Sequence, residues 1–186
     1  MKDYFALMGI PRRPLVDDAA VKEAYYRLAA AWHPDAERGE TEKFRQLQVA
    51  YQTLKEPGSR LRHLAELEFG PAENSSRPSE QMDLFLVVGA VVQEAKAFQS
   101  RRDGARSFLA KAVLGEAGRE IRQRVRGVQT QVETALDGLR ADLNAIDQRW
   151  PEVSPAELQT LTSGWRYLSR WQSELAAAEF ALMVGA

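Results

Sequence analysis

The strongest constraint on the fold is a proline between two amphipathic segments, residues 21–32 and 42–56. Both segments repeat apolar residues at steps of three and four, the spacing of one helical face. These positions are Val21, Tyr25, Leu28 and Trp32, then Phe44, Leu47, Tyr51 and Leu54. Pro34 disfavours a helical conformation at His33 and therefore ends the first helix there. Two such helices can bury each other as an antiparallel pair, which leaves His33, Pro34 and Asp35 exposed at the turn.

Composition excludes several classes of function. The chain has 186 residues, 45% of them hydrophobic, which is enough for one or two compact domains,. Its net charge of −1 gives no general attraction to nucleic acid or to an anionic membrane,. The longest apolar run, residues 84–92, is too short to span a bilayer,. Neither nucleic acid nor a membrane is therefore expected as a partner.

The chain contains no cysteine, which excludes disulfides and thiolate metal sites,. Met1 leads directly into Asp3 and the first helix, without a charged and apolar leader of the secretory type,. Both observations favour a cytoplasmic protein.

One break divides the chain. Residues 71–80 collect proline, serine, asparagine and charge, a loop composition,. We therefore expect a first domain at 1–70, a linker at 71–79 and a second domain at 80–186. A short helix, residues 59–69, closes the first domain and ends at Gly70.

Three helical tracts are expected in the second domain, at 80–101, 121–150 and 154–182, and the whole chain is predicted to be all-α. Gly115 and Gly118 leave open whether residues 103–118 form a separate helix. Ser154, Pro155 and Glu157 form a capping box with proline at the first helical position,. The apolar faces of these three helices can pack together as a three-helix bundle. A monomer is expected, with a coiled-coil dimer as the alternative.

The run 84–92 is apolar on every side. It could pass for a buried strand, but no other strand candidate exists to pair with it, so a helix is preferred. Packing in a bundle needs one face, assigned to Met82, Phe85, Leu86, Gly89 and Val92. This assignment leaves Leu84, Val87, Val88 and Val91 outside, and such a surface patch marks a partner site.

An acid–base dyad of His33 and Asp35 is disfavoured, because Pro34 splays the two side chains and no nucleophile or phosphate loop accompanies them,. Other ionisable groups also have ordinary interpretations. His63 is expected on the surface of its helix, and Lys22, Arg27, Lys43 and Arg45 can form a solvated face,. No enzyme activity, cofactor or metal site is therefore predicted.

Residues 3–69 nevertheless match a known pattern. It comprises Asp3-Tyr4-Phe5, then AYYRLAAAWHPD, then FRQLQVAYQTLKEPGSR. The pattern resembles the J domain, by which J-proteins stimulate the ATPase of DnaK-type chaperones. The resemblance implies that His33, Pro34 and Asp35 dock on the chaperone and that Lys22 and Arg27 belong to the basic face that meets it. Glu23, Tyr26 and Ala31 stand where many J domains carry basic residues, so this face is thin.

The stretches LKEPGSRLRHLAELEFG and SGWRYLSRW are similar to the HscB family, J-proteins that serve iron–sulfur cluster assembly. This resemblance implies a DnaK/HscA-type chaperone as partner and an iron–sulfur scaffold protein as client. It assigns client binding to Leu84, Phe85, Val88 and Tyr167. Gly89, Val92 and Lys96 stand where the family places acidic residues. Two alternatives stay open: a J-protein adaptor for another client, and a non-catalytic helical interaction protein.

Overall fold

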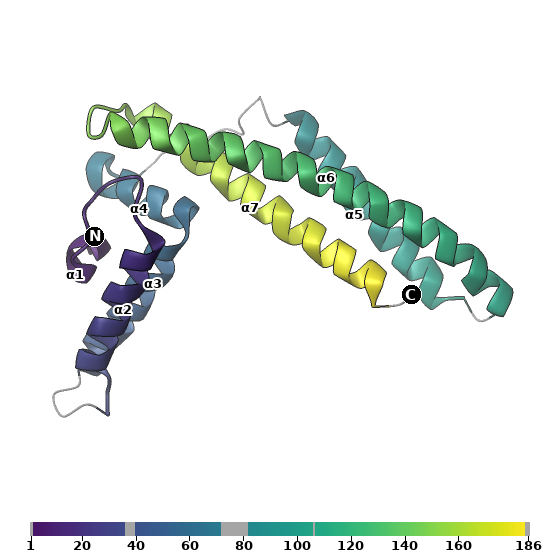
Figure 1. The fold of residues 1–186 in the computed structure, drawn as a ribbon, viewed down its shortest axis with the longest axis horizontal. Coiled ribbons are helices and arrows are strands. Elements are labelled where there is room, and N and C mark those ends of the chain that lie inside the picture. Colours follow the sequence, from purple (N-terminus) through teal and green to yellow (C-terminus); the bar gives the residue numbers. More distant parts are fainter. Residues whose placement is uncertain (1, 36–39, 72–81, 106, 185–186) are drawn as a thin grey trace. The chain divides into compact units, whose positions relative to one another are not determined.

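The computed structural model describes residues 2–35, 40–71, 82–105 and 107–184, with only the backbone for 108–113. Its elements are all helices (Figure 1): α1 (Tyr4–Met8), α2 (Asp18–Trp32), α3 (Thr41–Lys55), α4 (Pro57–Phe69), α5 (Met82–Asp103), α6 (Phe108–Gln148) and α7 (Pro155–Met183). The described ranges hold no strand, so the predicted all-α class is confirmed, including a helix over the run 84–92.

The chain forms two compact units, and both include parts of α6 and α7. Unit 1 comprises Met1–Ser76 and Leu139–Arg166, and unit 2 comprises Arg77–Gly138 and Tyr167–Ala186. The expected linker at 71–79 lies outside the described residues except for Pro71. The division into a 1–70 domain and an 80–186 domain therefore stays a prediction.

Side-chain caps start the first two helices of unit 1. Asp3 accepts a hydrogen bond from the Ala6 amide at 3.1 Å, and Asp17 accepts one from the Ala19 amide at 2.9 Å,. α1 ends at Met8, and its C-cap Gly9 has a φ of 67°, in the left-handed region that glycine adopts without strain,. α2 ends at Trp32, and His33 has a ψ of 137° before Pro34. The predicted stop at the proline is confirmed.

The stripes of α2 and α3 pack against each other as the periodicity predicts. Val21, Leu47 and Leu54 are buried, and the ring of Tyr25 stacks on that of Tyr51 with centroids 4.3 Å apart. Each fully buried leucine contributes about 1.5–3 kcal/mol relative to an exposed one. The hairpin is therefore a well-packed base for its exposed turn.

His63 on α4 corrects a prediction, because it is buried instead of lying on the surface. Its Nε2 accepts a hydrogen bond from the Tyr4 amide at 3.2 Å, and its ring stacks on the Tyr4 ring at 4.6 Å. Burial lowers the pKa of His63, mainly because the charged ring would lose its hydration,. The flanking leucines of the sequence do not reveal that α1 covers this position.

Arg60, on the same helix, is also buried. Its Nη1 donates to the Leu54 carbonyl at 2.9 Å, which satisfies a carbonyl at the end of α3,. Burial lowers the pKa of Arg60, against the opposing effect of Asp18.

The second part of unit 1 shares the hydrophobic core of α1 to α4. Its buried members are Leu143, Ile146, Val153, Leu158, Leu161 and Trp165. Trp165 lies so close to Gly58 at the start of α4 that a Cβ there would be 3.2 Å from its Cδ1. Helices α1 to α4 and the turn between α6 and α7 therefore form one packed unit.

Polar contacts reinforce this packing. Arg13 Nε and the Leu15 amide both donate to Asp147 Oδ1 at 2.9 Å, and Arg13 Nη2 also donates to the carboxylate. Trp150 Nε1 donates to the Arg12 carbonyl at 3.0 Å. Burial raises the pKa of Asp147, but the bonds from Arg13 and Leu15 outweigh it, so the pKa lies below its ordinary value. Asp147 is therefore an ionised carboxylate, and in this form it holds residues 12–15 in place.

The capping box at the start of α7 is confirmed. The Ser154 amide donates to Glu157 Oε2 at 2.9 Å, and the Glu157 amide donates to Ser154 Oγ at 3.2 Å,. The bond from the Ser154 amide, followed by that from Arg149, lowers the pKa of Glu157 to about 2. Glu157 is therefore ionised near neutral pH, where it can accept the hydrogen bonds of the capping box.

In unit 2 the predicted stripes of α6 and α7 are buried as expected, at Ile121, Val125, Val128, Val132 and Leu136, and at Leu168, Trp171, Leu175 and Leu182. Arg124 pairs with Glu94 of α5, and Arg126 Nε donates to Glu179 of α7 at 2.7 Å. α6 runs unbroken from Phe108 to Gln148, so residues 108–118 are not a separate helix. Gly118 instead provides room for the ring of Phe98, whose Cζ would lie 2.9 Å from a Cβ. No helix of the described chain is apolar enough over its length to cross a membrane.

Candidate functional site

The tripeptide after α2 presents its carboxylate to solvent. The Asp35 side chain is 89% exposed, and the His33 side chain is half exposed. The Asp35 amide donates to His33 Nδ1 at 3.2 Å. The His33 ring packs edge-on against Phe44 of α3 with centroids 5.2 Å apart. Asp35 Oδ2 lies 3.5 Å from the same His33 nitrogen, so the expectation that Pro34 splays the two side chains is wrong. The hairpin therefore positions His33, and the exposed Asp35 carboxylate is accessible to a partner.

Contacts around α3 hold the two ends of the turn together. The Glu40 amide donates to the Trp32 carbonyl at 3.2 Å. Lys43 Nζ donates to Glu40 at 2.8 Å and lies 5.8 Å from the centroid of the Trp32 ring,. The last turn of α2 is thus tied directly to the first turn of α3.

Lys22 and Arg27 are both exposed on α2, but the helix does not bring them together. Five positions at about 100° each place them roughly 140° apart around the axis. Tyr26, one turn after Lys22, is 61% exposed. Neither cation makes an ion pair with a described residue. The predicted basic face therefore consists of two separate positive charges beside an exposed aromatic ring.

The predicted client patch is partly assembled in unit 2. Phe85 of α5 and Tyr167 of α7, both half-buried, lie beside the ring of Trp171, with centroids 6.0 and 6.1 Å from it. Leu84 is half-buried as well. The helices thus bring together two of the four predicted residues, Phe85 and Tyr167, around Trp171.

Val88 is the exception, because it is 2% exposed. The prediction that Val88 and Val91 lie outside the packing face is wrong. The assignment of Met82, Leu86 and Gly89 to that face is also wrong, because all three are exposed. The buried face of α5 runs through Val88, Val91, Val92, Ala95 and Phe98, whereas Leu86 is exposed. The valine-rich run is apolar on every side, so its sequence carries no period that could select a face.

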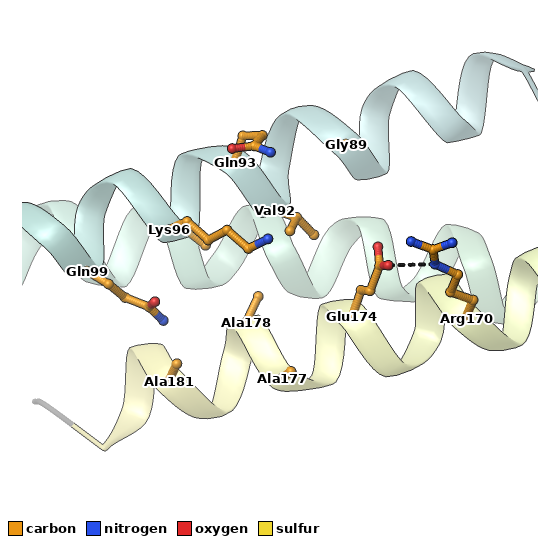
Figure 2. Close-up of a pocket in the computed structure, with 11 residues that line it drawn as sticks. Gly89, Val92, Gln93, Lys96, Gln99, Arg170, Glu174, Ala177, Ala178 and Ala181 are labelled. Atoms are coloured by element: carbon orange, nitrogen blue, oxygen red, sulfur yellow. Dashed lines mark hydrogen bonds and ion pairs between the residues drawn. The ribbon is translucent and has the colours of Figure 1, made fainter.

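A groove of about 500 Å³ continues from this patch between α5 and α7 (Figure 2). Gly89 follows Phe85 by one helical turn, and Arg170 follows Tyr167 by one turn, and both line the groove,. Figure 2 shows Lys96 and Glu174 reaching into this space from opposite helices. Glu174 accepts a hydrogen bond from Arg170 Nε at 2.8 Å, while Lys96 has no ion pair among the described residues. This groove is also lined by the three residues that stand where the HscB resemblance implies acidic side chains, namely Gly89, Val92 and Lys96.

Comparison with known proteins connects these features. The family model of the DnaJ domain matches residues 3–63, which include the exposed tripeptide. A co-chaperone protein, an HscB homolog from Chromobacterium violaceum, is 32% identical over 143 residues, which are 73% of this chain and 77% of that protein. The chain belongs to the HscB co-chaperone family. It is therefore a J-domain co-chaperone.

Two solved structures show the same fold. HscB from Vibrio cholerae has a TM-score of 0.63 at 18% identity, over 98% of this chain and all of that one. The human co-chaperone HscB has a TM-score of 0.60 at 21% identity, over 95% of this chain and 82% of that one. The expected architecture of an HscB protein, an N-terminal J domain with further helices after it, is thus confirmed.

Sequence reasoning missed several contacts between residues that are distant in the chain. Asp147 and Trp150 hold the 12–15 segment across more than 130 positions of sequence, and no local pattern links them to Arg13. Trp171, whose ring lies beside those of Phe85 and Tyr167, was not among the predicted client-binding residues. Among the described residues, no group of three or more histidine, aspartate or glutamate side chains could hold a metal ion.

Proposed function

We propose that this HscB-family protein stimulates ATP hydrolysis by a DnaK/HscA-type chaperone through His33, Pro34 and Asp35. One observation carries the proposal: the Asp35 carboxylate is 89% exposed at the end of a packed helical hairpin of the J-domain family. A carboxylate held in this way can accept charge-assisted hydrogen bonds from a partner. Because the ring of His33 already packs against Phe44, its side chain loses little conformational entropy on docking,.

Lys22 and Arg27 contribute at long range in this proposal. Exposed charges mainly accelerate and orient an encounter and add little to the final affinity. The two side chains flank the hairpin on different sides of α2, so each guides the approach separately,. The chemical step belongs to the chaperone, and the co-chaperone supplies contacts only.

Asp35→Asn tests this docking function directly. The variant should abolish ATPase stimulation, because the neutral amide replaces an acceptor-only group by a mixed donor and acceptor. Its stability should change by less than about 0.5 kcal/mol, as for surface substitutions generally. Asp142→Asn, which changes an exposed carboxylate on α6, is the matched control. Normal stimulation by Asp35→Asn would show that the tripeptide is only a turn.

We further propose that the protein carries an iron–sulfur scaffold as its client, acts as a monomer and works in the cytoplasm. Family membership and the half-exposed rings of Phe85 and Tyr167 support the client proposal. Leu84 directly precedes Phe85 and is half-buried, whereas Val88 is buried and contributes to the core. Aromatic residues are favoured among the few interface residues that provide most of the binding energy.

Tyr167→Ala in the full-length protein tests the client surface. Binding to an iron–sulfur scaffold, measured by titration calorimetry, should weaken by more than about 1 kcal/mol, the threshold of an interface hot spot. ATPase stimulation should be kept. Phe180→Ala, which truncates an exposed aromatic residue elsewhere on α7, is the matched control and should bind normally. Val88→Ala reports on the core instead, so its binding loss should accompany a lower melting temperature. Equal affinities for Tyr167→Ala and Phe180→Ala would place the client elsewhere.

A further inference from the structure

A second cavity, of about 840 Å³, lies within unit 2 where the end of α5, the beginning of α6 and the end of α7 meet. Its volume is within the range of about 300–1,000 Å³ that is typical of small-molecule sites. The apolar part of the wall is formed by Phe98, Leu114, Leu182 and Val184. The charged part is formed by Arg102, Asp103, Arg119 and Arg122. The cavity therefore combines an apolar wall with three guanidinium groups, here called the arginine cluster (Arg102, Arg119 and Arg122).

Two members of the arginine cluster have a structural role. Arg102 Nη1 donates to the Ala181 carbonyl at 3.2 Å, and Arg122 Nη2 donates to the Leu182 carbonyl at 2.9 Å. Both bonds satisfy carbonyl groups in the last turns of α7, which otherwise lack helical partners. These contacts explain why Arg102 and Arg122 are present, but they use only part of each guanidinium.

The remaining donors have no structural explanation. Arg122 Nε is buried without a hydrogen-bond partner. Arg119 is exposed and makes no hydrogen bond or ion pair with a described residue. A buried N–H without an acceptor is unfavourable, and an anion that enters the cavity would supply one. The cluster therefore has donors in excess of those that α7 needs.

The charges around the cavity are also unbalanced. Asp103 is the acidic residue in its wall, with Oδ1 3.8 Å from Arg102 Nε. The carboxyl end of α7 adds about half a negative charge. Glu116 and Glu120 are on α6, but they do not line the cavity. Among the described residues, more than one positive charge therefore remains without compensation next to an apolar wall.

We propose that this cavity binds a small anionic amphiphile, a carboxylate or phosphate monoester with an apolar chain. The head group accepts hydrogen bonds from Arg119 and Arg122, because planar guanidinium groups match both kinds of anion. The chain lies against Phe98 and Leu182. This site is separate from the tripeptide and from the client surface, so the proposal does not depend on the co-chaperone function.

Titration calorimetry of the full-length protein with decanoate, decyl phosphate and decanol, below their aggregation concentrations, tests the ligand class. At least one of the two anions should bind about tenfold more tightly than decanol, the effect expected of one charge-assisted hydrogen bond. The stronger anion identifies the preferred head group. Equal affinities for the anions and decanol, or no heat from either anion, would overturn the proposal.

Variants of Arg119 test the role of the cluster, because its side chain makes no bond that the fold requires. Arg119→Gln should weaken anion binding about tenfold, whereas Arg119→Lys keeps the charge and should retain most of the affinity. Arg124→Gln, on the same helix but paired with Glu94 outside the cavity, is the matched control and should bind normally. Equal losses for Arg119→Gln and Arg124→Gln would overturn the proposal, since they would indicate a general effect of charge.

Discussion

Gly118→Ala should destabilise the protein relative to Gly127→Ala, although the two substitutions are chemically identical and lie on the same helix. Alanine is favoured over glycine in a helix interior by about 1 kcal/mol, a gain available at both positions. A Cβ at Gly127 meets no atom within 4 Å. A Cβ at Gly118 would lie 2.9 Å from Phe98 Cζ and 3.3 Å from its Cε1.

The steric cost decides the result. Carbon atoms pack favourably at about 3.5–4.0 Å, so the Phe98 ring would have to move by roughly 0.6–1 Å. This ring is 3% exposed. Overpacking of a buried site costs about 1–3 kcal/mol, which equals or exceeds the helix-propensity gain. Gly127→Ala should therefore stabilise the protein by about 1 kcal/mol. The free energy of unfolding of Gly118→Ala should be about 1–3 kcal/mol lower than that of Gly127→Ala.

Thermal unfolding, followed by calorimetry, measures this difference. For a chain of this size, 1 kcal/mol corresponds to about 2–4 °C, so the two variants should melt about 2–12 °C apart. Adding Phe98→Leu to Gly118→Ala should recover part of the loss, because the smaller side chain relieves the contact. If Gly118→Ala melts as high as Gly127→Ala, the Phe98 ring is not held against α6 and the reasoning is wrong.

Two further predictions concern the J domain. Because burial lowers the pKa of His63, the unfolded chain binds more protons below pH about 6.5, so stability should fall as the pH decreases through this window,. In chemical denaturation between pH 7 and 5.5, His63→Gln should reduce this loss of folding stability. An unchanged dependence of stability on pH would exclude His63 as its source. Combining Lys22→Glu with Arg27→Glu should slow association with the chaperone and reduce its salt sensitivity in stopped-flow measurements. Lys96→Glu is the charge-reversal control, and equal rates for all variants would make the two cations ordinary surface residues.

The sequence alone determined the features that depend on local chemistry. Pro34 ends α2 whatever surrounds it, and the stripes of α2 and α3 can be satisfied only by mutual burial. The exposure of Asp35 follows from these two facts. The capping box at Ser154 was equally predictable, because both of its partners lie within one turn,.

Only the tertiary structure decided the features that depend on neighbours distant in sequence. His63 is buried because α1 covers it, and its own helix gives no sign of this. Val88 is core because the bundle selects one side of a segment that is apolar all round. Arg13 and Asp147 are 134 positions apart, so the bond that ties the J-domain segment to α6 exists only in the folded chain. Local patterns determine where helices begin and end, whereas the choice of buried face and of polar partner requires the energy of long-range packing.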